Sequence, residues 1–333
     1  MSVFLSIGIT SYKRLSELER CILSLKTIYN DEIEVIVSED CSPQSNEIGK
    51  LVERLEKKVP FILKFMPNEK NLGYDENLGA IIKKCSGEYI FFMSDDDKFE
   101  SGCLDDIIPV LKRKNKLGVF YSSFIYESTK KLDRNNKNNF EIEKGEKNAC
   151  KYIYDSILFS GLIFKKDYVI DFDSTRFKNY NYFQVYMFLS MIYKYGGYYF
   201  SNPSVVCVGD GENAYGISES SGGNALLANR KSVISNLEFN KTLIKTIKLF
   251  DEDNSTHVFN SFEKQYSVHS YSGLSIARQC GIKYYREYWR KLKSLEIKLF
   301  PISKIYYVLL FVFGKKVCDI FLKVFKKIKH KDF

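Results

Sequence analysis

The sequence contains few of the residues on which several common kinds of site depend. It has three His (257, 269 and 330) and one Trp among 333 residues, and its eight Cys stand singly, without a Cys-x-x-Cys pair. Zinc sites of the structural kind need clustered Cys and His ligands, and small secreted folds need a framework of paired cysteines. The sequence therefore argues against both classes, and we expect eight reduced thiols, as in a protein of the cytosol.

Several longer patterns are also absent. The glycine-rich signatures of dinucleotide sites and of P-loops do not occur, which argues against both kinds of nucleotide site. No run of 18 apolar residues occurs, so we expect no membrane span. Residues 1–9 are apolar but lack a basic leader and a cleavage site, and this favours a strand over a signal peptide.

Positive charge is concentrated at one end of the chain. Residues 283–333 hold fourteen Lys and Arg against four Asp and Glu, whereas the whole chain carries a formal charge of +9. The rest of the chain is therefore about neutral. A basic end of this kind is typical of proteins that bind nucleic acid or an anionic membrane surface.

The first hundred residues alternate between two apolar patterns. Short apolar runs predict strands, and apolar residues at helical spacing predict the helices between them, the first with Ser16 and Glu19 as a possible capping pair. This alternation is typical of an α/β fold with a mainly parallel sheet. The expected strands cover residues 3–9, 34–37, 61–66 and 89–93, and the expected helices cover 15–25, 47–58, 74–85 and a stretch from about 101.

Three adjacent carboxylates, Asp95, Asp96 and Asp97, follow the fourth expected strand. Like charges side by side repel each other, so a positive group should lie close to them. Mg²⁺ and Mn²⁺ bind carboxylate oxygens and keep positions for phosphate oxygens, and ligands of open α/β sheets bind beyond the carboxyl ends of strands. The triplet therefore predicts a metal and phosphate site. The alternative is an acidic turn that caps the helix starting near Ser101.

Four segments together resemble the inverting family 2 glycosyltransferases, which have a GT-A fold. Residues 9–14 resemble that family's Ile-Pro-Thr-Tyr-Asn-Arg loop, and residues 37–42 resemble its Val-Asp-Asp-x-Ser loop. Residues 71–77 resemble its Asn-x-Gly-x-x-x-Asn segment, and residues 87–97 resemble its Gly-Asp/Glu-Tyr strand with the acidic cluster that follows it. The sequence of residues 71–78 is most similar to that of the abequosyltransferase-like branch, whose members add sugars to bacterial surface glycans.

The resemblance implies a role at each matching position. The metal would be Mn²⁺ or Mg²⁺, held by Asp95, Asp96 and Asp97. Some positions depart from the family pattern: Thr10 replaces Pro, Lys13 replaces Asn, Glu39 replaces Asp, and Ser94 stands where many members have Asp. From the sequence alone, Asp40 could equally form a turn with Ser42, and Gly73 could serve only the backbone. The implied nucleotide-sugar contacts are Thr10, Tyr12, Arg14, Asp40, Asn71, Gly73, Asn77 and Asp95.

The general base is missing from its usual place. Most of this family carries Glu-Asp near the start of a late helix, where this chain has residues 182–185, Tyr-Phe-Gln-Val. An amide cannot take a proton, so Gln184 is no substitute. The catalytic residue is therefore unassigned, with Asp173 as a weak candidate beside Asp171, Asp210 and Glu212. The resemblance places the acceptor near Ser160 and Gly161.

The second half of the chain gives a weaker pattern. We expect an exposed loop over residues 133–148, a strand within 156–166, a helix over 184–195, a strand over 198–208 and a mobile loop over 209–223. Residues 224–280 predict two or three helices. We divide the chain into a GT-A domain, residues 1–215, and a helical C-terminal region, residues 216–333.

The C-terminal end interleaves basic and aromatic residues at helical spacing, which is typical of a helix lying on an anionic membrane. The alternative is a helix packed on the domain with its charges in water. We expect removal of the chain after about Gly281 to spare the nucleotide site. The apolar residues in question are Trp289, Leu299, Phe300, Tyr306, Tyr307, Leu309, Leu310, Phe311, Phe321 and Phe325.

The sequence as a whole predicts a metal-dependent inverting glycosyltransferase. It would move a hexosyl or deoxyhexosyl group from a nucleoside-diphosphate sugar to a glycan or lipid-linked acceptor. It would work as a peripheral protein at the cytoplasmic face of a membrane, without nucleic acid. The alternatives are a nucleotidyltransferase with a similar acidic site, which would release pyrophosphate, and a basic nucleic-acid-binding module.

Overall fold

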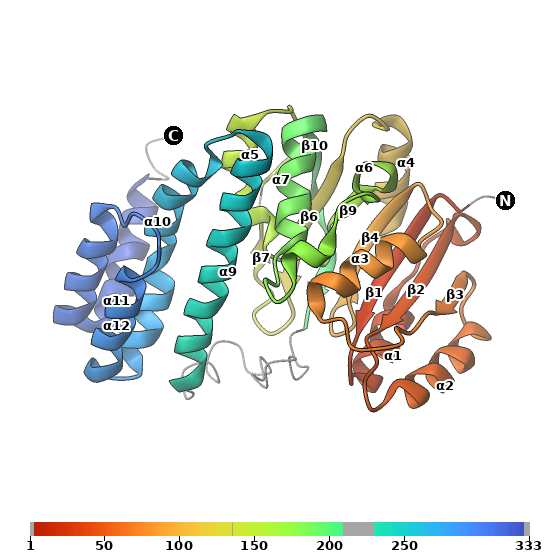
Figure 1. Cartoon of the computed structure of the whole chain (residues 1–333), viewed down its shortest axis with the longest axis horizontal. Coiled ribbons are helices and arrows are strands. Elements are labelled where there is room, and N and C mark those ends of the chain that lie inside the picture. Colours follow the sequence, from red (N-terminus) through yellow and green to blue (C-terminus); the bar gives the residue numbers. More distant parts are fainter. Residues whose placement is uncertain (1–2, 135, 209–229, 330–333) are drawn as a thin grey trace.

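A computed structural model describes residues 3–134, 136–208 and 230–329, and the side chains of all of these except 230–236, 238 and 322–329. Its centre is a ten-stranded sheet with helices on both faces (Figure 1). The eight strands of the main path follow the order β3-β2-β1-β4-β9-β6-β10-β5, while β7 pairs with β6 and β8 pairs with β10.

The first hundred residues form the predicted parallel unit. Strands β1, β2, β3 and β4 run parallel in the order β3-β2-β1-β4. The predicted helices lie between them, each within a few residues of its expected bounds. These elements are β1 (Leu5–Ser11), α1 (Leu15–Ser24), η1 (Asn30–Glu32), β2 (Ile33–Glu39), α2 (Ser45–Glu56), β3 (Ile62–Phe65), α3 (Tyr74–Lys84) and β4 (Tyr89–Ser94).

The second part of the sheet is mixed, so the expectation of a mainly parallel sheet holds for only part of it. Strand β9 runs antiparallel to both of its neighbours, β4 and β6, whereas β6 and β10 are parallel to each other. The elements are β5 (Lys98–Phe99), α4 (Cys103–Arg113), β6 (Val119–Tyr126), β7 (Leu132–Asp133), β8 (Phe140–Ile142), α5 (Glu146–Lys151), η2 (Ile153–Ser156), β9 (Ile163–Lys165), α6 (Lys166–Val169), η3 (Ser174–Phe177), α7 (Phe183–Tyr195) and β10 (Gly197–Cys207).

Two local expectations were wrong, and one alternative is excluded. Residues 133–148 are not one exposed loop, because β8 pairs with β10 and buries Ile142. Ser16 does not cap α1, since its hydroxyl donates to Glu17 instead. The aspartate triplet does not cap α4 either, because β5 intervenes and α4 begins after Gly102, whose φ of 72° places it in the left-handed region.

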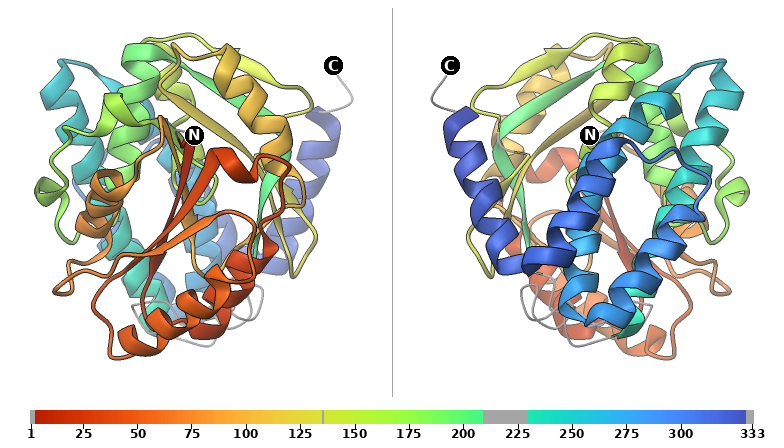
Figure 2. Two further views of the ribbon diagram at one scale, coloured as in Figure 1. Left: turned by 90° about the vertical axis from the view of Figure 1, so that its right-hand side faces the viewer. Right: turned by 90° about the vertical axis from the view of Figure 1, so that its left-hand side faces the viewer.

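The sheet separates two apolar cores, and β4 shows how. Its side chains alternate, so Tyr89, Phe91 and Met93 pack with α1, α2 and α4, while Ile90 and Phe92 pack with α3 and α7. Helices consequently flank both faces (Figure 2). A strand covered on both faces explains why the sequence shows an unbroken apolar run there.

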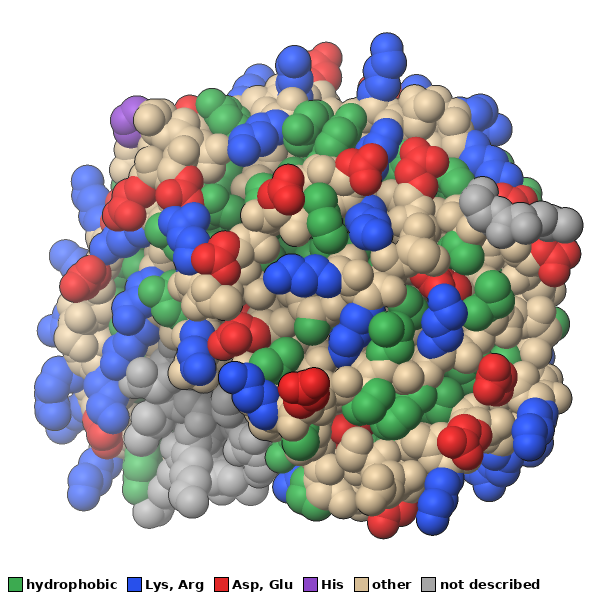
Figure 3. Space-filling model, turned by 45° about the vertical axis from the view of Figure 1, so that its right-hand side comes forward, with side chains coloured by type: hydrophobic (Ala, Val, Ile, Leu, Met, Phe, Trp, Pro, Cys, Tyr) green, Lys and Arg blue, Asp and Glu red, His purple; other side chains and the backbone are tan. Residues whose placement is uncertain are grey.

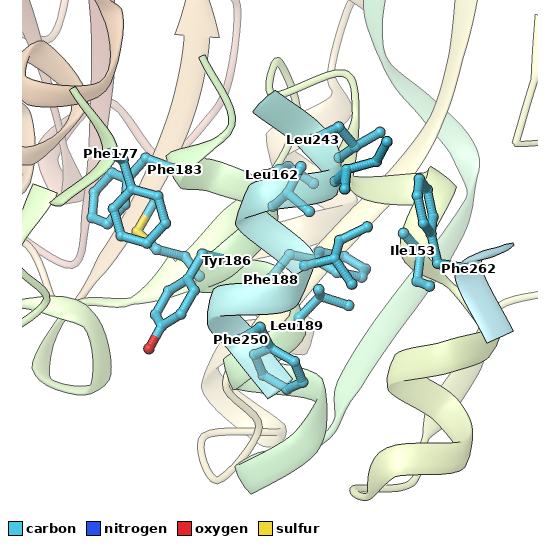
Figure 4. Packing of buried hydrophobic residues seen from close by; sticks show 14 of the residues in the cluster. Ile153, Leu162, Phe177, Phe183, Tyr186, Phe188, Leu189, Leu243, Phe250 and Phe262 are labelled. Carbon is cyan, nitrogen blue, oxygen red and sulfur yellow. The ribbon is translucent and has the colours of Figure 1, made fainter. Parts of the chain in front are cut away.

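Four helices follow β10 in the described part of the chain and extend the second core. These are α9 (Arg230–Asn254), α10 (Val258–Gln279), α11 (Ile282–Lys293) and α12 (Pro301–Lys329). Phe250 and Leu243 of α9 pack against Tyr186 and Phe188 of α7, as Figure 4 shows. The predicted boundary at 215/216 lies outside the described residues, as does the loop over 209–223. Among the described helices, none is long and apolar enough to cross a bilayer.

Candidate active site

A cleft of about 1080 Å³ lies where the parallel strands end. The loops after β1, β2 and β4 contribute to it, as do the segment before α3 and the end of β10. Its size suits a ligand larger than a single sugar. All of the residues predicted to bind nucleotide or metal line it: Thr10, Tyr12, Arg14, Asp40, Asn71, Gly73, Asn77, Asp95, Asp96 and Asp97.

Asp95 is buried against the loop that follows β1. Its carboxylate accepts hydrogen bonds from the Tyr12 backbone N–H at 3.2 Å and from the Arg14 guanidinium at 2.8 Å. Burial raises the pKa of Asp95 to about 7, and the positive charge of Arg14 opposes that rise. The positive group expected beside the triplet is therefore, at least in part, Arg14.

Asp96 is the most accessible of the three aspartates. Its side chain is 17% exposed, against 2% for Asp95, and one carboxylate oxygen lies 3.0 Å from the Arg14 guanidinium. The Ser94 hydroxyl donates to the other oxygen, and Arg20 donates to the Asp96 backbone carbonyl at 2.8 Å. Asp96 thus presents a carboxylate, already oriented, to the cleft.

Asp97 connects the triplet to the opposite wall. Its carboxylate accepts from the Ser160 hydroxyl at 2.7 Å and from the Val208 backbone N–H at 3.3 Å. Burial, with the charge of Asp96 second, raises the pKa of Asp97 to about 7. The Ser160 hydroxyl oxygen in turn accepts a hydrogen bond from the Ser94 backbone N–H at 3.1 Å. Asp97 therefore joins β4 to the segment before β9.

The three aspartates point to different partners and do not form a metal cage by themselves. In the parts of the chain that the structure describes, no group of three or more His, Cys, Asp or Glu side chains could hold a metal ion. A Mg²⁺ or Mn²⁺ ion can nevertheless be bound by one or two carboxylates together with substrate phosphates. Asp96 fits such an arrangement best, because its carboxylate is the most exposed of the three, although Arg14 and Ser94 contact it, whereas Asp95 and Asp97 are buried.

Asp40 shapes the loop before α3. Its carboxylate accepts from the backbone N–H groups of Leu72 and Gly73, both at 2.8 Å, and from the Asn68 amide at 2.9 Å. The turn with Ser42 that the sequence allowed is not what Asp40 forms. Gly73 has a φ of 78°, in the region that favours glycine. The backbone conformation therefore explains why a glycine stands at this position, without a contact to a ligand.

Asn77 has a similar internal role. Its amide oxygen accepts from the Ser38 hydroxyl at 2.7 Å and from the Asn68 amide at 2.9 Å. Its amide nitrogen donates to the Ser38 carbonyl at 3.3 Å. Asn77 therefore borders the cleft while tying α3 to the end of β2.

One buried carboxylate in this region was missed from the sequence. Asp75, in the first turn of α3, is 2% exposed and accepts from the backbone N–H groups of Tyr180, Asn181 and Phe183 at 3.1, 2.7 and 3.0 Å. Burial raises its pKa to about 6, although these hydrogen bonds oppose the rise. An Asp in a first helical turn resembles an ordinary dipole partner, so no sequence signal marked this contact.

The start of α7 forms the wall where a base was expected. Gln184 lines the cleft and is 2% exposed. Its amide nitrogen donates to the Ile157 carbonyl at 3.3 Å, and its amide oxygen is buried without a hydrogen-bond partner within the described part of the chain. The amide oxygen can accept a hydrogen bond from a ligand but cannot remove a proton.

Asp173 does not lie in the cleft lining. It accepts from the backbone N–H and the hydroxyl of Thr175 at 3.0 and 2.7 Å, as the cap of η3, and these bonds lower its pKa. A lowered pKa makes a carboxylate a weaker base. Asp171 is also outside the lining, and Asp210 and Glu212 fall among residues that the structure does not describe.

The remaining lining is largely apolar and aromatic, and the sequence did not reveal it. Phe124 and Tyr126 come from β6, and Tyr74 makes an edge contact with Phe159 at a ring distance of 5.5 Å. Ser160, which the resemblance placed on the acceptor side, lies in the same wall. The cleft therefore has a charged end at Arg14 and the aspartates, and an apolar wall that also includes polar side chains such as Lys131 and Asn179.

Known proteins named as glycosyltransferases are similar in sequence to part of this chain. A Campylobacter jejuni protein named GalNAc(5)-diNAcBac-PP-undecaprenol beta-1,3-glucosyltransferase is 30% identical over 104 residues, which are 31% of this chain and 33% of that protein. A Haemophilus influenzae protein named uncharacterized glycosyltransferase is 26% identical over 117 residues, 35% of this chain and 37% of that protein. The matches thus span about a third of the length of these relatives.

Solved structures share the fold. Residues 1–349 of S. aureus TarS superpose with a TM-score of 0.53 at 16% identity, covering 90% of this chain and 97% of that one. The mannosyltransferase PcManGT from Pyrobaculum calidifontis, solved with GDP-Man and Mn²⁺, gives 0.54 at 12% identity, covering 95% and 83%. These likenesses support the GT-A type of fold. Residues 6–174 match the sequence profile described as "Glycosyl transferase family 2". The chain therefore belongs to glycosyl transferase family 2.

Proposed function

We propose that this protein transfers a sugar, with inversion, from a nucleoside-diphosphate sugar to a hydroxyl group. The observation that carries the proposal is the charged end of the cleft, where Arg14 faces Asp95 and Asp96 at 2.8 and 3.0 Å. In this arrangement a cation and an accessible carboxylate lie at the ends of parallel strands, where nucleotides bind in open α/β sheets. Membership of the family supports the same activity.

The charged end of the cleft is the proposed donor site. Arg14 would stabilise the negative charge that develops on the departing diphosphate, because a fixed cation in a partly buried site needs no rearrangement. The loop over 71–73, held by Asp40, would contact the base and ribose through its backbone and the Asn71 side chain. Thr10 and Tyr12 would border the same ligand from the β1 loop.

Asp96 would hold a divalent metal, Mn²⁺ or Mg²⁺, at this end of the cleft. When bound it would supply positive charge to the leaving group. PcManGT was solved together with Mn²⁺ and GDP-Man, which supports the proposal by analogy. The residues of the protein have two roles here. The Ser94 hydroxyl orients the Asp96 carboxylate, and the positive charge of Arg14 compensates the negative charge of Asp95.

The acceptor would lie against the apolar wall, near Ser160 and Gln184. We propose a glycan or lipid-linked acceptor, by analogy with the undecaprenol-linked substrate in the name of the Campylobacter relative. We also propose that the enzyme works at the cytoplasmic face of a membrane. The sequence of residues 71–78 favours a member of the abequosyltransferase-like branch, which would transfer a hexosyl or deoxyhexosyl group.

The nucleic-acid-binding alternative receives little support. Over the face shown in Figure 3, acidic and basic side chains are interspersed, without a continuous basic groove in view. The positive excess of the chain lies mainly in α11 and α12, and both helices contribute side chains to the second core.

Product analysis tests the proposal and separates it from a nucleotidyltransferase. The protein would be incubated with UDP- and GDP-sugars, Mn²⁺ and a polyprenyl-diphosphate-linked sugar. We expect release of nucleoside diphosphate that Asp96→Asn abolishes and that Asp106→Asn, an exposed control on α4, leaves unchanged. Release of pyrophosphate, or full turnover by Asp96→Asn, would refute the proposed reaction.

A further inference from the structure

Exposed apolar side chains gather on one helix at the far end of the molecule from β3 (Figure 1). Nine of the large hydrophobic residues that are exposed in the described chain lie within a single stretch of α12. They include some of the most exposed, Val312 and Ile320 at 61% each. The nine are Ile305, Val308, Leu309, Phe311, Val312, Phe313, Val317, Ile320 and Phe321.

Their spacing places apolar residues along one side of each half of the helix. Ile305, Val308, Leu309 and Val312 stand at i, i+3, i+4 and i+7, which places them on one side of a helix. Val317, Ile320 and Phe321 repeat the spacing after Gly314. Gly314, with a φ of 71°, kinks α12 and separates the two halves. We call these seven residues the α12 strip.

The opposite side of α12 is firmly packed. Leu310 is fully buried, Cys318 is 4% exposed, and the Tyr307 ring stacks on Trp289 and Tyr285 at 4.5 and 4.9 Å. Trp289, Tyr307 and Leu310, which the sequence assigned to a membrane contact, therefore serve the core instead. Because α12 is anchored by its inner side, the strip is a surface feature of the fold and not part of a detached tail.

The charge beside the strip indicates what covers it. Residues 301–329 contain seven Lys and one Asp, and that Asp319 is paired with Lys315 and Tyr271. Lys304 and Lys316 are exposed next to the strip. Exposed apolar side chains bordered by lysines, almost without acidic groups, match an anionic lipid surface, where basic residues meet headgroups and apolar ones enter the acyl boundary.

We propose that the α12 strip lies in the headgroup region of an anionic bilayer and holds this protein on the membrane. The proposal rests on the function proposed above, because it would hold a transferase for lipid-linked acceptors at the membrane that contains them. This mode of binding needs no membrane span, and among the described helices none is long and apolar enough to form one.

The test is vesicle co-sedimentation of the full chain with phosphatidylcholine alone and with added phosphatidylglycerol. The variant Val308→Ser/Val312→Ser removes two apolar groups from the strip. The matched control Ile28→Ser/Ile62→Ser removes two exposed apolar groups elsewhere, at 77% and 46% exposure. We expect wild type and control to bind anionic vesicles, and the strip variant to bind at least about tenfold more weakly with an unchanged melting temperature.

Three outcomes would overturn the proposal. These are equal binding by the strip variant and the control, no binding by the wild type, or a wild-type dimer that the strip variant dissociates, which would assign the strip to a second copy. Calorimetry with UDP and GDP keeps this test separate from the proposed reaction. Vesicle binding without nucleotide binding would support the membrane role of the strip and contradict the transferase. Nucleotide binding without vesicle binding would support the transferase and contradict the membrane role of the strip.

Discussion

Arg14 is the residue on which the charged end of the cleft depends. It is 15% exposed and contacts both Asp95 and Asp96, whereas the surface pair of Arg54 and Glu19 is 56% and 36% exposed. Removing one partner from a buried pair leaves an uncompensated charge, while an exposed pair contributes little. Arg14 should therefore matter for stability as well as for ligand binding.

We predict that Arg14→Ala lowers the free energy of unfolding by about 3 kcal/mol, because Asp95 stays buried without its counter-charge. Arg54→Ala should cost less than about 1 kcal/mol. Urea denaturation of the two variants measures this difference. Equal losses would mean that Asp95 is neutral in the folded protein and needs no cation.

We predict that Asp40→Ala weakens nucleoside-diphosphate binding by about 1–3 kcal/mol, the usual cost of losing a buried hydrogen-bonding group. The effect would be indirect, since the Asp40 carboxylate holds the backbone of Leu72 and Gly73. Asp173→Ala is the control, because Asp173 caps η3 outside the cleft lining. Calorimetry that shows unchanged affinity in Asp40→Ala would separate the 71–73 loop from the nucleotide site.

At the scale of elements, Asp75 joins two parts of the cleft. It belongs to α3, which follows the proposed donor loop, yet its three hydrogen bonds go to the segment that leads into α7. One of the donors, the N–H of Phe183, is the first of α7 and has no acceptor within that helix, so a side chain from another helix satisfies it. The packing is close, because a Cβ on Gly79 of α3 would lie 2.1 Å from the Ser174 hydroxyl oxygen.

We predict a pH-dependent contribution of Asp75 to stability. Its pKa in the folded chain is raised to about 6 from an ordinary 3.8, chiefly by burial. A raised pKa means that the folded state holds the proton more tightly, so this contribution is present below pH 4 and is lost as the pH rises through about 6. Relative to Asp75→Asn, which does not titrate, the wild type should gain up to about 3 kcal/mol between pH 7 and pH 4.

Denaturation of wild type and Asp75→Asn across that pH range gives the difference directly. A flat difference would show that the pKa of Asp75 is ordinary. If the wild type instead loses stability relative to Asp75→Asn as the pH falls, the three N–H hydrogen bonds lower the pKa of Asp75 more than burial raises it.

At the scale of the whole molecule, the sequence predicted the part of the fold in which neighbouring segments pair. Strands β1 to β4 and the helices between them follow from periodicity, and their ends brought Arg14, Asp40 and the aspartates to one cleft as expected. A strand was expected within 156–166, where β9 lies, but its place in the sheet was not, because its partners β4 and β6 are distant in sequence. The hydrogen bonds of Asp75 to residues 180–183 also join segments that are distant in sequence, so the sequence did not predict them.

The C-terminal region was expected to be separable, and its packing argues otherwise. Tyr285 and Leu292 of α11 are fully buried and Tyr288 is 4% exposed, all within the core that also contains α7. We predict that truncation after Gly281 lowers the melting temperature by several degrees or prevents soluble expression, since Leu295, Leu310 and Cys318 leave the core together with these three side chains. A truncated chain that melts like the full one in calorimetry would show that these helices are an independent unit.

The most direct test of the central claim is calorimetric titration of the full chain with UDP and with GDP, each in the presence of Mn²⁺ and of EDTA. We predict binding of at least one of the two nucleotides at the cleft, weakened by EDTA and by Asp96→Asn, and unaffected by Asp106→Asn. Binding that is the same in Asp96→Asn as in the wild type, or no binding of either nucleotide with Mn²⁺ present, would contradict it.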